Sequence, residues 1–288
     1  MKYAINFYRN CRVLPKADEI IIKYTESGEK DLIRFAQELP QEQRLIVNTC
    51  EVDLEYLDYE IFNAAASAHK NIAFIISRTL HPQRKFDFYE CNLPYFFIEP
   101  ISSLDDFEGV INCGVSDIYV ANELGFYLER ISPICKAKGI AIRVYPNVAQ
   151  SSSKFLTPNL KTFFIRPDDV VVYEPYVDVL EFWGPIDKQP VLYDIYHDGR
   201  WQGRLQDIIL ELNDDIDNTR IMPIFGAART RCRKECAYDQ CHICDHIKSA
   251  AATLEVKELK LKRKKRVYEH DLDGNNLQDD SGTTESDT

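Results

Sequence analysis

The chain contains no long apolar run, no leader-like segment and no excess of positive charge. Its apolar stretches fall short of the roughly 20 residues that span a bilayer. Residues 1–19 lack an apolar core followed by a small-residue cleavage site. With 35 Lys and Arg against 46 Asp and Glu, the formal net charge is -11, which argues against a surface that coats nucleic acid globally. We therefore expect a cytoplasmic protein with no membrane contact.

Several familiar catalytic signatures are also missing. No glycine-rich phosphate loop of the Rossmann or Walker type is present, which weakens the case for a nucleotide-binding sheet. No Gly-x-Ser-x-Gly elbow and no local Cys-His signature supports nucleophilic catalysis. The 288 residues are 45% hydrophobic, which is enough for one large domain with a sizeable core.

The sequence does contain short apolar runs that alternate with stretches of helical periodicity. Eight runs precede residue 168: YAINFY, EIIIKY, RLIVNT, NIAFIIS, YFFIEP, SDIYVA, IAIRVYP and TFFIRP. A further run, VDVLEFWG, lies near residue 180. This alternation indicates βαβ units and a parallel sheet whose strands are covered on both faces. We predict an α/β fold, a (β/α)8 TIM-like barrel over residues 1–220, with an open doubly wound sheet as the alternative.

Residues beyond the predicted barrel strands carry further patterns. Residues 190–213 are expected to form a strand, a turn at His197-Asp198-Gly199 and then a helix. The basic run Lys260–Arg266 is a candidate for nucleic-acid contact or simply a solvated helix end. Residues 267–288 are acidic and almost free of apolar side chains, so we expect a disordered tail.

Four cysteines gather in the segment RCRKECAYDQCHICDH, within a predicted metal-binding region at residues 221–266. They are Cys232, Cys236, Cys241 and Cys244, with the spacing C-x3-C-x4-C-x2-C. A tight cysteine cluster in a cytosolic chain indicates metal binding rather than disulfides. Four thiolates suit a structural zinc ion and equally a [4Fe-4S] cluster, and the spacing leaves both open. The other five cysteines are scattered and are expected to be reduced thiols.

The stretch GVSDIYVANELGFYLERISPICKAKGIAIRVYPNVAQSS resembles the middle of the collagenase-like peptidase family (peptidase family U-32). TFFIRPDDV and LEFWG resemble the strand segments that follow there, so the resemblance covers roughly residues 100–185. It implies a TIM barrel with a cysteine-ligated iron-sulfur cluster. It also implies oxygen-independent hydroxylation of RNA or quinone precursors, or a peptidase activity. The present chain departs from the family because its four cysteines come late and close together. The resemblance favours iron-sulfur over zinc.

Polar residues follow nearly every predicted strand, where barrel enzymes place their chemistry. Among them, Glu99 and Glu123 are our candidates for proton transfer. The candidates for binding an anionic substrate are Arg78, Arg143, Asn147 and Arg166. The favoured hypothesis is an iron-sulfur enzyme that acts on RNA or a small aromatic substrate. The alternative is a non-catalytic, zinc-stapled protein that binds nucleic acid or a protein partner.

Overall fold

The computed structural model describes residues 1–7, 16–25, 29–52, 58–80, 84–121, 124–149, 163–221 and 225. Within these residues, eight parallel strands form one sheet. They are β1 Lys2–Asn6, β2 Glu19–Lys23, β3 Arg44–Asn48, β4 Ile72–Ile76, β5 Tyr95–Phe97, β6 Asp117–Tyr119, β7 Ala141–Val144 and β8 Val179–Glu181. The strand order is β5-β4-β3-β2-β1-β8-β7-β6, so the first strand pairs with the last.

The sheet curves back until its two edge strands, β5 and β6, meet. Ser116 N donates to Tyr95 O at 2.8 Å, and Ile101 N donates to Tyr119 O at 2.8 Å. These bonds bring β5 and β6 together without a continuous ladder, so the barrel is nearly closed. The predicted α/β, TIM-like barrel is therefore confirmed at this level, and an open doubly wound sheet does not fit the pairing of β1 with β8.

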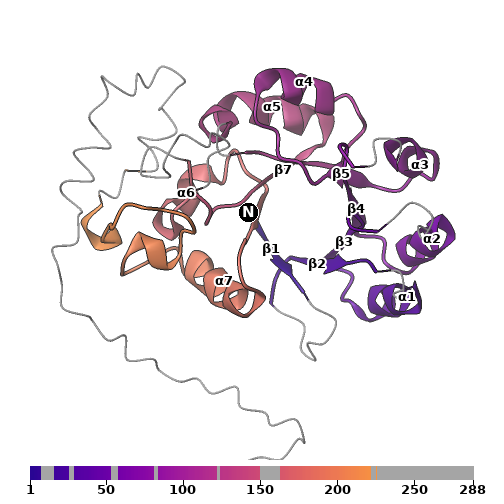
Figure 1. The fold of residues 1–288 in the computed structure, drawn as a ribbon, viewed down its shortest axis with the longest axis horizontal. Coiled ribbons are helices and arrows are strands. Elements are labelled where there is room, and N and C mark those ends of the chain that lie inside the picture. The colour runs from indigo at the N-terminus through magenta and orange to yellow at the C-terminus, as the bar shows by residue number, and fades with distance from the viewer. Residues whose placement is uncertain are drawn as a thin grey trace, which may run out of the picture. The chain divides into compact units, whose positions relative to one another are not determined.

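The helices lie outside the ring of strands, as Figure 1 shows for α1 to α5 and α7. Their bounds are α1 Glu29–Glu38, α2 Tyr59–Ala68, α3 Arg84–Glu90, α4 Leu104–Val110, α5 Leu128–Lys138, α6 Val170–Tyr173 and α7 Gln189–Asp198. Local signals set their ends. Asp58 and Ser103 accept backbone N–H bonds at the starts of α2 and α4, and Gly139 ends α5 in a left-handed conformation at φ 69°.

Two features of the predicted organisation are wrong. TFFIRP is not the eighth strand: residues 163–166 lie outside the sheet, and Val179–Glu181 takes that place. The run is apolar because Phe163, Phe164 and Ile165 are buried in the core. A continuous apolar run cannot by itself separate a strand from another buried segment.

The second error concerns residues 190–213. The first part is helix α7 rather than a strand, with Pro190 in its first turn and Leu192 and Tyr196 buried four residues apart. Gly199, at φ 65°, ends it, so the predicted turn is the end of this helix. The predicted helix that follows is replaced by a short 3-10 turn, Leu205–Asp207.

In the part of the chain that the structure describes, no helix is both long and apolar enough to cross a membrane.

Candidate functional site

The barrel lumen contains a buried network of charged side chains. Arg143 on β7 donates from Nη1 to Glu19 Oε2 at 2.6 Å and to Asp117 Oδ1 at 3.2 Å. Its Nη2 donates to Glu181 Oε2 at 3.1 Å. Arg44 completes the network with two 2.7 Å bonds to Asp117. These residues come from five strands, so internal ion pairs fill this part of the lumen. The anions that the predicted anion-binder Arg143 contacts are carboxylates of the chain itself.

Above this network, two tyrosines connect Glu181 to the carboxyl end of the barrel. Tyr119 donates to Glu181 Oε2 at 2.6 Å. The Tyr119 and Tyr145 rings stack, with centroids 5.1 Å apart and planes 12° from parallel. Burial, and after it the nearby Glu181 carboxylate, raises the pKa of both phenols well above the usual value. Both hydroxyls therefore stay protonated at neutral pH.

The next ring along this path is Trp183, at the mouth of the barrel. It meets Tyr145 edge-on, with centroids 5.4 Å apart and planes at 74°. Asn147 holds the Trp183 backbone, and its predicted role in substrate binding stays a prediction. Its Nδ2 donates to Trp183 O at 2.8 Å, and its Oδ1 accepts from Trp183 N at 3.0 Å. Asn147 is buried, whereas Trp183 remains 54% exposed.

Gln189 connects the loop that carries Trp183 to β1. The buried Gln189 side chain accepts from Asn6 N at 2.9 Å and donates to Gly184 O at 3.0 Å. The sequence predictions did not single out Gln189 or Trp183. A signal for Trp183 exists, because it lies two residues after Glu181 and strand side chains alternate between the two faces.

Exposed charged side chains lie on the same rim of the barrel. Lys23, the last residue of β2, forms an ion pair with Glu51, which follows β3. Because the carboxyl ends of parallel strands meet at one end of a barrel, this pair shares the rim with Trp183. The rim therefore presents an aromatic ring, a cation and a carboxylate.

Glu99, a predicted proton-transfer residue, is held by the loop after β4. It accepts bonds from the Ser77 and Thr79 hydroxyls and from the backbone N–H groups of Arg78 and Thr79. Partial burial by itself raises the pKa of Glu99, but these bonds outweigh it and lower the pKa below its usual value. Glu99 is thus a carboxylate at neutral pH and orders this loop, and its proton-transfer role stays a prediction.

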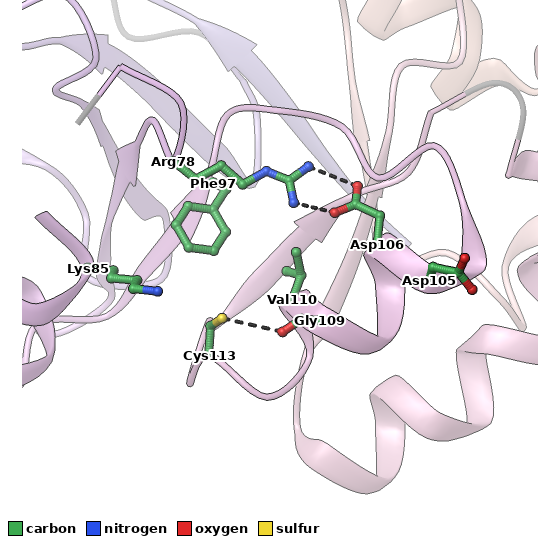
Figure 2. Close-up of a pocket in the computed structure, with 8 residues that line it drawn as sticks. All are labelled: Arg78, Lys85, Phe97, Asp105, Asp106, Gly109, Val110 and Cys113. Carbon is green, nitrogen blue, oxygen red and sulfur yellow. Dashed lines mark hydrogen bonds and ion pairs between the residues drawn. The ribbon is translucent and has the colours of Figure 1, made fainter. Parts of the chain in front are cut away.

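Arg78, a predicted anion-binding residue, spans a surface pocket and binds both carboxylate oxygens of Asp106 (Figure 2). The pocket has a volume of about 280 Å³, and its lining residues are Arg78, Lys85, Phe97, Asp105, Asp106, Gly109, Val110 and Cys113. Phe97 faces away from the lumen, since its neighbour Phe96 lies under the Arg143 guanidinium, 5.1 Å from the ring centroid. The pocket therefore lies outside the barrel lumen.

The pocket also yields a prediction about stability. Gly109 lies in the last turn of α4, and an added Cβ would meet no atom within 4 Å beyond its chain neighbours and the backbone of its own helix. Gly109→Ala should stabilise the protein by about 0.5–1 kcal/mol, because alanine loses less conformational entropy in a helix. Gly125→Ala is the contrasting variant, since its Cβ would lie 2.3 Å from Phe163 Cγ. Urea denaturation of both checks this, and a destabilised Gly109→Ala would contradict it.

Arg166, the last predicted anion-binding residue that the structure describes, is also buried in internal contacts. Its Nε and Nη2 donate to the two Asp169 carboxylate oxygens at 2.6 and 2.8 Å, and Nη1 donates to Asn218 Oδ1 at 2.9 Å. The Phe225 ring centroid lies 5.1 Å from its guanidinium carbon. Arg166 thus joins the segment after residue 163 to that near residue 218.

The remaining predicted site residues lie outside the described residues: Glu123, Cys232, Cys236, Cys241, Cys244 and the run Lys260–Arg266. Among the described residues, no group of three or more His, Cys, Asp or Glu side chains is arranged to hold a metal ion. Four of the scattered cysteines, Cys50, Cys91, Cys113 and Cys135, are described, and none of these four forms a disulfide. Comparisons with protein-family models, with curated proteins and with solved structures give no match to this chain.

Proposed function

We propose that the protein is a cytoplasmic iron-sulfur enzyme built on a TIM-like barrel, which modifies RNA or a small aromatic substrate. The observation that carries the proposal is the combination of a nearly closed parallel barrel with a single segment bearing four cysteines. The resemblance of residues 100–185 to the collagenase-like peptidase family supports the same combination.

The donor set fits the proposed cofactor by its chemistry. Cys232, Cys236, Cys241 and Cys244 offer four soft thiolate ligands, which is the number that a [4Fe-4S] cluster takes. Arg231, Arg233 and Lys234 are adjacent cations that favour the thiolate form. A bound cluster would supply one-electron transfer.

The described residues would bind and orient the substrate at the carboxyl end of the barrel. Trp183 and Tyr145 provide aromatic surface there, and Lys23 with Glu51 provides charge. Below them, Tyr119, Glu181 and Arg143 fill the lumen and keep water out of it. The substrate would therefore approach from the mouth, because the lumen is closed beneath it.

Anaerobic purification followed by metal analysis and an absorption spectrum tests the proposal. We expect a brown protein with about four irons per chain, and we expect Cys241→Ala to lose iron and colour. Cys91→Ala is the matched control, because Cys91 is a free, half-buried thiol in the barrel and should leave the iron content unchanged. A colourless protein that holds about one zinc ion would contradict the proposal and favour the zinc-stapled binding protein.

A further inference from the structure

We propose that Trp183 is a stacking platform for a flat aromatic ring at the barrel mouth, and that Asn147 is the residue that positions it. This inference rests on the proposed function, because it names Trp183 as the residue that contacts the substrate of that enzyme. It concerns ring binding alone, however, and can be tested whether or not a metal is bound.

The position and exposure of Trp183 suit this role. Large aromatic side chains are mostly buried in folded proteins, yet Trp183 is 54% exposed. It follows β8 at the carboxyl end, where barrel enzymes bind substrates. Glu181 lies in the lumen, so strand alternation directs Trp183 to the same side two residues later. The indole thus adds apolar surface where a ligand would enter.

Among the described residues, no aromatic side chain is stacked on a face of the Trp183 ring. Within the described ranges, the aromatic ring that contacts Trp183 is that of Tyr145, and the planes of the two rings are 74° apart. No described ring lies parallel to the indole, whereas the deeper Tyr119–Tyr145 pair is stacked at 12°. A flat ligand ring lying parallel to the indole would make the offset-stacked contact that aromatic pairs prefer.

The loop that carries Trp183 is fixed before any ligand binds. Asn147 bonds to both backbone polar groups of Trp183, as a neighbouring strand would. Gly184 follows at φ 116°, a conformation that side-chain-bearing residues rarely adopt, and its carbonyl accepts from the buried Gln189. A platform held in place loses little entropy on binding, so stacking would contribute more to affinity.

Charges on the same rim indicate the ligand class. Lys23 ends β2, which is two strands from β8 with β1 between them, and it pairs with the exposed Glu51, which follows β3 one strand further on. A flat ring that carries a polar or anionic substituent could stack on Trp183. Its substituent would then take the place of one member of the Lys23–Glu51 pair as the partner of the other. Such a ring belongs either to a small aromatic acid or to a nucleobase.

Intrinsic fluorescence can isolate this site, because the chain has two tryptophans, Trp183 and Trp201. In a full-length Trp201→Phe variant, Trp183 is the one remaining tryptophan. We expect 4-hydroxybenzoate or adenosine to quench its emission in a saturable way, and the non-planar cyclohexanecarboxylate not to do so. Saturation by 4-hydroxybenzoate assigns the site to a small aromatic acid, and saturation by adenosine assigns it to a nucleobase. The absence of saturable quenching by both, or equal binding of cyclohexanecarboxylate, would overturn the proposal.

Calorimetry then tests the two residues, with Trp183→Leu made in the otherwise unchanged protein. Trp183→Leu should weaken binding of the ring by about tenfold or more, because a stacking partner is lost. Asn147→Ala, made in the Trp201→Phe background, should weaken binding and also lower the fluorescence anisotropy of Trp183. A purely structural Asn147 would leave that anisotropy unchanged once circular dichroism shows a folded barrel. Undiminished binding by Trp183→Leu would also overturn the proposal, whereas an iron-free protein that still binds the ring would contradict the proposed function alone.

Discussion

Replacing Arg143 by methionine is expected to lower the free energy of unfolding by about 3–5 kcal/mol. Arg143 is fully buried and bonds to Glu19, Asp117 and Glu181, none of which has appreciable contact with water. Methionine would fill much of the same volume. It would leave Arg44 as the cation beside Glu19 and Asp117, and the Tyr119 hydroxyl as the donor to Glu181. Buried charge without a partner is costly, and the carboxylates cannot turn to solvent from inside the lumen.

Urea denaturation followed by circular dichroism measures this effect. Arg204→Met is the control, because the Arg204 side chain is 55% exposed and pairs with Asp207 at 3.4 Å. It should change the free energy of unfolding by less than about 1 kcal/mol. The double variant Arg143→Met/Glu181→Gln should recover part of the lost free energy of unfolding, since it removes one of the buried carboxylates that Arg143 contacts. Equal effects of Arg143→Met and Arg204→Met would contradict a central role for the lumen network.

The barrel could be predicted from sequence because its strands are buried on both faces. EIIIKY and NIAFIIS contain β2 and β4, each as an unbroken apolar run followed by a polar residue. Closure could not be predicted in the same way. It depends on bonds around β5 and β6, and a run such as TFFIRP is equally apolar although its residues from 163 onward pack in the core outside the sheet.

The sequence predicts that polar residues follow the strands, but not which groups these residues contact in the fold. Polar residues do follow the strands, yet Arg78, Arg143 and Arg166 all bind carboxylates of the chain itself. Arg143 and Glu19 lie 124 residues apart in sequence, so no local pattern pairs them. Asn147 is a predicted substrate ligand, and the structure adds that its amide holds the backbone of Trp183, a contact that depends on the bend after β8. The amino-acid types identify polar residues at the strand ends, whereas the contacts that each one makes depend on residues that only the fold brings together.

Asp117→Asn is expected to destabilise the protein by about 3 kcal/mol at pH 7, with an effect that disappears in acid. Burial by itself raises the pKa of Asp117, but Arg44, Arg143 and the Ser116 hydroxyl outweigh it and lower the pKa below its usual value. The folded protein therefore keeps this carboxylate ionised where the unfolded chain would protonate it. Its stabilising effect is complete above the unfolded-state pKa of about 3.9 and is lost as the pH falls through the lower, folded-state pKa.

Glu181→Gln is the contrasting variant, because burial raises the pKa of Glu181 despite its contacts with Arg143 and Tyr119. For this group the folded state binds the proton more tightly than the unfolded chain. Its ionisation therefore costs stability as the pH rises from the unfolded-state value to the folded-state value. Removing the charge should make Glu181→Gln far less harmful at pH 7 than Asp117→Asn, and should reduce the loss of stability above pH about 4.3. Urea titrations of both variants between pH 3 and pH 7 measure this. Parallel pH profiles for the two would contradict opposite electrostatic environments at the two carboxylates.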